Sequence, residues 1–197
     1  MRNNRTTVRT LVTSQGTCLA MSDGMVIWET PESRKTLQLR TTATAILGVK
    51  EDDQILSKVY IGDKLGQLNV IVLPQFELVY TSSISDSTLR SMFMDDVGEL
   101  VIADAQGSVW NVDEQGQTQL MFETKRSISS IRQEGKNIRI QSGWEQCLYT
   151  RSGKLANSED ASHSFGENVM LRRMREKKAL EIQRREAEAQ LRLLPSI

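Results

Sequence analysis

The chain has 197 residues, of which 39% are hydrophobic, 25% are charged and 5% are aromatic. This composition is lean for a globular protein but lies outside the disordered range. Lys plus Arg equals Asp plus Glu at 25 each, so no net field favours nucleic acid or an anionic membrane. No apolar run exceeds four residues, far short of the roughly 20 that cross a bilayer, so no membrane span is expected.

An internal repeat runs through most of the chain. Four segments, starting near residues 7, 44, 88 and 127, open with a small hydroxyl residue followed by apolar side chains in rough alternation. Such alternation is typical of a short, half-buried strand. The segments recur about every 40 residues, a period at which repeat architectures are common.

Each repeat contains the signals of four strands separated by tight turns. The turns are rich in Gly, Asp and Ser, because glycine tolerates positive φ and aspartate bonds its own backbone. In chain order the predicted strands cover 7–12, 18–21, 25–29 and 36–39; 44–49, 55–61, 68–73 and 76–80; 88–93, 100–103, 108–112 and 118–122; and 127–132, 138–141 and 145–149, with a weak fourth at Leu155.

Four strands in roughly 40 residues predict a propeller blade. A four-stranded meander that is apolar on both faces cannot bury them alone, whereas stacked neighbours bury each other. We therefore expect an all-β domain over residues 1–156, built of four four-stranded antiparallel propeller-type blades. Four is the lower limit for a propeller. The blades either close into a small ring or form an incomplete one, whose open blade edges would meet a protein partner or a second copy.

Two sequence stretches resemble known propeller repeats. Gly107-Ser-Val-Trp-Asn-Val-Asp113 resembles the third strand of tryptophan–aspartate repeats, and Met25-Val-Ile-Trp-Glu29 is a weaker copy. Gly98-Glu-Leu-Val-Ile-Ala-Asp104, followed by Gly107, is similar to quinoprotein-like repeats. The chain thus resembles the β-propeller repeat superfamily without matching one subfamily. The resemblance implies a scaffold whose ends serve as binding platforms.

The C-terminal part has a different character. Residues 157–167 form a polar linker, and residues 168–194 contain no Gly or Pro and place opposite charges four residues apart. This pattern predicts a charged C-terminal helix. Its glutamates oppose contact with nucleic acid, because they would repel phosphates. The candidate docking residues of this helix are Leu180, Ala187, Leu191, Leu194, Arg172 and Arg173.

Catalytic and metal-binding signals are weak. The single histidine, His163, falls in the linker, and Cys18 and Cys147 fall in predicted strands without metal spacing. Acidic clusters at 51–53 and 95–96 could offer oxygens to calcium, but no spaced calcium loop is present. We expect no enzyme activity and no cofactor. Two reduced cysteines favour a cytoplasmic location.

The best candidates for binding lie at one end of the predicted blades. The second turn of each repeat and the connection to the next repeat meet there. Trp144 is expected to be exposed, whereas Trp28 and Trp110 are expected to wedge between blades. The candidate protein-binding residues are Trp144, Lys125, Arg126, Arg40, Asp23, Lys64 and Gln106.

The expected function is a non-catalytic protein-interaction module or assembly subunit. Two alternatives remain at this point. One is a small-molecule sensor or enzyme with an axial propeller site. The other is a nucleic-acid-associated protein that uses the basic part of the tail helix.

Overall fold

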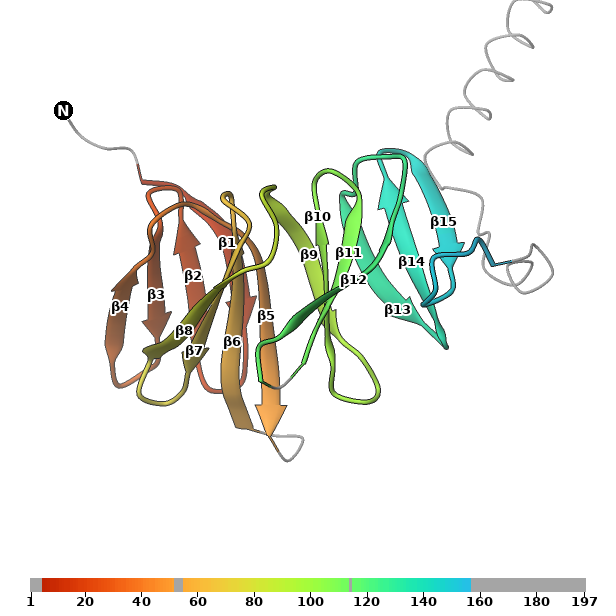
Figure 1. Ribbon diagram of the computed structural model, residues 1–197. Coiled ribbons are helices and arrows are strands. Elements are labelled where there is room, and N and C mark those ends of the chain that lie inside the picture. The colour runs from red at the N-terminus through yellow and green to blue at the C-terminus, as the bar shows by residue number, and fades with distance from the viewer. Residues whose placement is uncertain (1–4, 52–54, 114, 157–197) are drawn as a thin grey trace, which may run out of the picture. The chain divides into compact units, whose positions relative to one another are not determined.

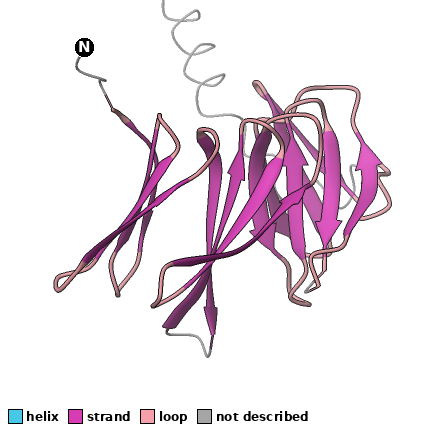
Figure 2. Ribbon diagram, turned by 60° about the vertical axis from the view of Figure 1, so that its left-hand side comes forward, coloured by secondary structure: helices cyan, strands magenta, loops and turns pink. Residues whose placement is uncertain are grey.

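The computed structural model describes residues 5–51, 55–113 and 115–156 (Figure 1). The chain divides into two compact units, Met1–Leu155 and Ala156–Ile197. The predicted linker and helix, with all six candidate docking residues of the tail, lie outside the described residues. Within the described residues every regular element is a strand (Figure 2). None of those residues belongs to a helix that could span a membrane.

The strands form four antiparallel sheets, each a meander in chain order. Sheet 1 contains β1 (Thr7–Val12), β2 (Thr17–Met21), β3 (Met25–Glu29) and β4 (Arg34–Gln38); sheet 2 contains β5 (Ala43–Glu51), β6 (Ile55–Asp63), β7 (Gln67–Val72) and β8 (Glu77–Ser83); sheet 3 contains β9 (Leu89–Met94), β10 (Leu100–Asp104), β11 (Ser108–Val112) and β12 (Thr118–Glu123); sheet 4 contains β13 (Ser130–Glu134), β14 (Asn137–Ser142) and β15 (Glu145–Tyr149). The all-β class and the four repeats are therefore confirmed.

The expectation of four strands in every sheet is wrong for sheet 4. In the described residues this sheet has three strands, and Leu155 makes only an isolated bridge with Tyr149. The turn that precedes Leu155 is well formed, since the Thr150 N–H donates to the Lys154 carbonyl at 2.8 Å. Among the described residues, Leu155 alone therefore occupies the position of a fourth strand.

Most strand boundaries differ from the predicted ones by one to three residues, and two of these differences have a clear local reason. β13 begins at Ser130 rather than at 127, because the preceding residues belong to the connection between sheets and bury Ile128, which is 1% exposed. β8 begins after Phe76, whose φ of 60° places it in a turn. Hydrophobic alternation alone does not separate a buried connection residue from the first residue of a strand.

Three hydrophobic clusters join successive sheets. The first lies between sheets 1 and 2 and includes Trp28, the second lies between sheets 2 and 3 and is contacted by Trp110, and the third lies between sheets 3 and 4. Both tryptophans therefore pack between sheets, as predicted. No cluster joins sheet 4 to sheet 1 among the described residues. The sheets are held together by face-to-face burial, the arrangement of propeller blades.

Sheet 4 differs from the other sheets on the face that points away from sheet 3. In sheet 3 the central strand directs Val101 and Ala103 toward the next sheet, and both are fully buried in the third cluster. The matching positions of β14 are Arg139 and Gln141. Arg139 is 5% exposed, and its guanidinium donates to Glu134 on the same sheet. The last sheet thus presents a polar face, as terminal repeats of stacked proteins do.

Candidate functional site

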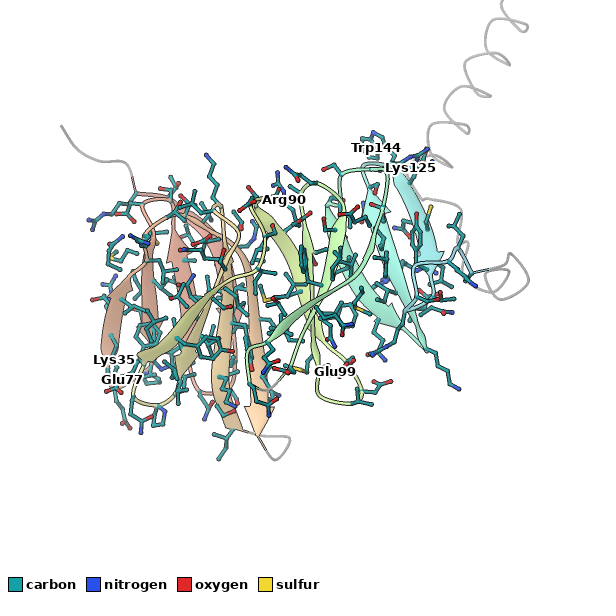
Figure 3. The ribbon with its side chains drawn as sticks, viewed as in Figure 1. Lys35, Glu77, Arg90, Glu99, Lys125 and Trp144 are labelled. Carbon is teal, nitrogen blue, oxygen red and sulfur yellow. The ribbon has the colours of Figure 1, made fainter. Side chains whose placement is uncertain are left out.

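The predicted binding residues all lie at one end of the sheets, which we call the connection end. It comprises the turns β2–β3, β6–β7, β10–β11 and β14–β15 and the links from each sheet to the next. Figure 3 shows Trp144 and Lys125 at this end, with Lys35, Glu77 and Glu99 at the opposite end. The four turns hold Asp23, Lys64, Gln106 and Trp144, and the links hold Arg40, Lys125 and Arg126.

A repeated threonine contact ties each link to the turn beside it. The Thr42 hydroxyl donates to the Ser22 carbonyl at 2.7 Å, and the Thr88 hydroxyl donates to the Lys64 carbonyl at 3.1 Å. In sheet 3 the Thr124 hydroxyl likewise reaches the Gly107 carbonyl at 3.1 Å. These contacts hold the turns and links of the connection end together.

Buried aspartates build two of the turns, which confirms the expectation that turn aspartates bond their own backbone. Asp63 and Asp104 each end the second strand of a sheet and are 1% exposed. The Asp104 carboxylate accepts backbone N–H bonds from Gln106, Gly107 and Ser108 at 2.9 to 3.0 Å. The spacing Asp-x-x-Gly marks such turns, because the fourth residue has positive φ, 115° at Gly107.

The structure places the predicted residues over several sheets, so they do not form one cluster. Asp23 is paired with Arg5 at 2.5 Å, and Arg126 is paired with Glu145. Among the described residues Lys125 has no ion-pair partner. Lys125 and Arg126 line a common groove at sheet 4, whereas Gln106 lines a separate groove.

This groove lies between the end of β12 and sheet 4 and has a volume of about 440 Å³. Ile140, Cys147, Tyr149 and Leu155 give it an apolar lining, and Leu155 is 62% exposed. The remaining lining residues are polar or charged and come from the β12–β13 link and the facing strands: Glu123, Thr124, Lys125, Arg126, Ser142 and Glu145. An apolar floor with a charged rim suits a segment of another protein.

Trp144 stands beside the groove in the two-residue turn between β14 and β15. It is 70% exposed, as expected, whereas Trp28 is 4% exposed. A large aromatic side chain held on a tight hairpin costs little conformational entropy when it is covered. Exposed tryptophans of this kind are enriched among residues that dominate binding energies.

The groove floor is held in place by an aromatic contact between sheets. The rings of Phe122 and Tyr149 stack with their centroids 5.6 Å apart. Burial raises the pKa of Tyr149, and the nearby Cys147 raises it further while Arg126 lowers it. The Tyr149 phenol is therefore neutral at physiological pH and serves as a packing surface with a polar tip.

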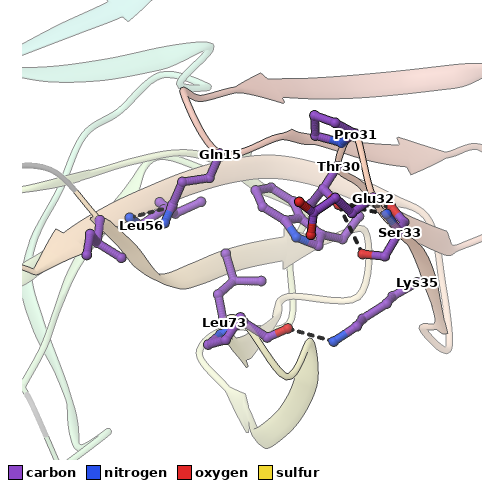
Figure 4. A pocket seen from close by; sticks show the side chains of 11 residues that line it. Gln15, Thr30, Pro31, Glu32, Ser33, Lys35, Leu56 and Leu73 are labelled. Atoms are coloured by element: carbon purple, nitrogen blue, oxygen red, sulfur yellow. Dashed lines mark hydrogen bonds between the residues drawn. The ribbon is translucent and has the colours of Figure 1, made fainter.

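Two further grooves open between sheets away from the predicted residues. One, of about 460 Å³, is lined by Trp28, Leu56 and Leu73 (Figure 4). Lys35 crosses it and donates to the Pro74 carbonyl at 2.8 Å. The other, of about 560 Å³, lies between sheets 2 and 3. No sequence signal marked either groove, because their walls come from positions that look like ordinary strand and turn residues.

The acidic cluster at 95–96 has a structural role. Asp95 is 6% exposed, accepts backbone N–H bonds from Val97 and Glu99 at 2.9 and 2.8 Å, and pairs with Arg151 of sheet 4. Burial raises its pKa, but the Arg151 and backbone hydrogen bonds outweigh this effect and lower the pKa below 3.8. The described residues contain no group of three side chains suited to a metal ion. Most of the 51–53 cluster lies outside the described chain.

The two cysteines differ in their surroundings. Cys18 is fully buried, and burial raises its pKa to about 12. Its thiol is therefore protonated at neutral pH and poorly nucleophilic. Cys147 is half-buried at the groove, and both cysteines are free thiols. His163 lies outside the described residues.

No protein-family model matches this chain, and no curated protein matches its sequence. Solved structures do match its fold. The computationally designed Ika4 protein superimposes with a TM-score of 0.64 at 11% identity, covering 75% of this chain and 92% of that one. The computationally designed Ika8 protein gives 0.60 at 12% identity, covering 73% and 45%. A chain of the Mitotic Checkpoint Complex gives 0.65 at 9% identity, covering 80% and 53%.

At these identities the likeness shows the fold alone. The four antiparallel sheets form a propeller-like stack. The chain spans about half the length of the Ika8 and checkpoint-complex chains that it matches.

Proposed function

We propose that this chain is a non-catalytic protein-interaction module of the β-propeller repeat superfamily and binds its partner at the connection end of sheet 4. The observation that carries the proposal is the exposed Trp144 beside a groove with an apolar floor and a cation, Lys125, that has no ion-pair partner among the described residues. Specific interfaces usually combine a buried apolar area with charges that are paired by the partner. A structural match to a chain of a multiprotein complex supports the same class of function.

A binding role fits the chemistry of the groove better than catalysis. The described chain holds no histidine, and the Arg126 side chain is already paired with Glu145. A cytoplasmic location is part of the proposal and rests on the two free cysteines.

We propose a different protein as the partner, rather than a second half-ring. Closing a ring with a second copy would cover the outward face of sheet 4, where the polar Arg139 and Gln141 take the positions of the apolar Val101 and Ala103 of sheet 3. An apolar face stacked there would meet polar side chains to which it offers no hydrogen bonds, so it would gain less than the apolar contacts that join the other sheets. A dimeric mass in light scattering of the purified chain would contradict this choice.

The proposal is tested by comparing partners of matched surface variants. Trp144→Ala and Lys125→Ala alter the proposed site, and Val97→Ala alters an equally exposed apolar side chain (74% exposed) in the β9–β10 turn at the opposite end. Quantitative affinity purification should find proteins that are lost from both site variants and retained by Val97→Ala. Equal recovery from all variants would refute the proposed site.

A further inference from the structure

We infer that the outer edge of β15 binds an extended strand of a partner protein, which completes sheet 4. This inference rests on the proposed function and deepens it by naming the form of the partner. Sheets 1 to 3 each place a fourth strand beside the third, whereas β15 pairs on its outer side only at Tyr149, with Leu155, in the described chain.

The turn after β15 repeats the turn that starts the fourth strand of sheet 3. The Asp113 N–H donates to the Gln117 carbonyl at 3.1 Å, and the Thr150 N–H donates to the Lys154 carbonyl at 2.8 Å. Tyr149 pairs with Leu155 as Val112 pairs with Thr118. The position of β12 beside β11 therefore shows where a fourth strand belongs beside β15.

The backbone of β15 can accept such a strand. Ser142 and Glu145 flank a two-residue turn and form a hydrogen-bonded pair, so the pairs alternate from there along the hairpin. Gln146 and Leu148 consequently point their N–H and carbonyl groups away from β14. The matching residues of sheet 3, Val109 and Asn111, are paired with β12. Unpaired edges of this kind are templates for strand addition.

The residues that line the groove determine which side chains fit on the added strand. A residue opposite Cys147 faces the lining formed with Ile140, Tyr149 and Leu155, so an apolar side chain fits there. An acidic residue near the β12–β13 link would pair with Lys125. The partner segment is therefore extended, apolar on alternate residues and acidic toward the connection end.

The sequence that follows Leu155 is a poor competitor for this position. It reads Ala-Asn-Ser-Glu-Asp, without a β-branched or aromatic residue, whereas β12 contains the β-branched Thr118 and the aromatic Phe122. Such a composition is depleted in strands. This comparison favours a strand from another protein over the chain's own residues.

The test uses the full chain and a peptide copy of residues 117–124, the strand that completes sheet 3. Hydrogen exchange of the Gln146 and Leu148 amides is measured by NMR with and without the peptide at millimolar concentration. We expect fast exchange in the chain alone and about tenfold slower exchange when the peptide is about tenfold above its Kd. Slow exchange in the chain alone, or no slowing with peptide, would overturn the inference.

Matched variants separate edge pairing from other binding. Gln146→Pro removes the outward N–H at a position where an edge strand tolerates proline, and it should abolish the slowing at Leu148. Gln146→Thr keeps the N–H and should retain it, and circular dichroism checks that both variants fold. Trp144→Ala should leave peptide protection intact. If the peptide does not slow the exchange, but affinity purification still finds partners that Trp144→Ala loses, this inference is wrong and the proposed function stands.

Discussion

The buried turn aspartates give the sharpest stability prediction. Asp104→Ala removes a carboxylate that accepts three backbone N–H bonds at 2.9 to 3.0 Å and faces the Trp110 ring N–H at 3.5 Å. Hydrogen bonds to a charged group contribute about 1.5 to 3 kcal/mol each, and a buried unpaired donor costs about 1 to 3 kcal/mol. Because water enters part of the vacated space, we expect a loss of about 3 to 5 kcal/mol.

The matched control is Asp113→Ala, which affects a turn of the same Asp-x-x-Gly spacing. Within the described chain, the half-buried Asp113 carboxylate accepts one hydrogen bond, from the Gln117 backbone N–H at 2.8 Å. Loss of a single, partly hydrated bond should cost about 1 kcal/mol. The two variants share the Asp-x-x-Gly spacing and differ in burial and in the number of hydrogen bonds lost. A difference in stability between them is therefore due to burial and hydrogen bonding, and not to the spacing.

Urea unfolding of the full chain, followed by circular dichroism, measures both variants. With a slope of about 2 kcal/mol per molar urea, Asp104→Ala should shift the midpoint by about 2 M and Asp113→Ala by about 0.5 M. Similar shifts for the two variants would refute the argument that buried aspartates, rather than the turn spacing, hold the connection end together.

Three further predictions concern backbone, pH and thiols. Gly66→Ala should cost more than Gly98→Ala, by at least about 2 kcal/mol in urea unfolding, because both residues have positive φ but only at Gly66 would a Cβ lie 1.9 Å from the Ser85 carbonyl oxygen. Because the pKa of Asp95 is lowered in the folded state, its contribution to the free energy of unfolding is complete above the unfolded pKa and is lost as pH falls through the folded pKa. Asp95→Asn should therefore lower the free energy of unfolding at pH 7. It should also reduce the stability that the protein loses between about pH 5 and 3. Iodoacetamide in native buffer should modify Cys147 while Cys18 reacts only after unfolding, because Cys18 is fully buried with a pKa of about 12.

Much of the fold could be predicted because each repeat combines two independent signals. Hydrophobic alternation marks strands such as β11, which was predicted with the same bounds, and Gly-containing turns mark their ends. The start of β13 was not predictable in this way. Ile128 precedes it as a buried connection residue, and a one-dimensional pattern does not distinguish burial in a link from burial in a strand.

The candidate site was predictable only in part. The connection end follows from blade topology, and the exposure of Trp144 follows from its place in a turn. The pairing of Arg126 with Glu145 and of Asp23 with Arg5 joins residues distant in sequence, so no local pattern contains it. The groove likewise depends on how two sheets face each other.

The polarity of sheet 4 determines where a partner can add. A partner that stacked on its outward face would meet Arg139 and Gln141 in place of the apolar Val101 and Ala103 that sheet 3 offers to its neighbour. An apolar partner would supply no hydrogen bonds to these polar side chains. A strand added at the outer edge of β15 would instead supply hydrogen bonds to the backbone of Gln146 and Leu148. The same sheet therefore disfavours growth of the stack across its face and favours growth of the sheet along its edge.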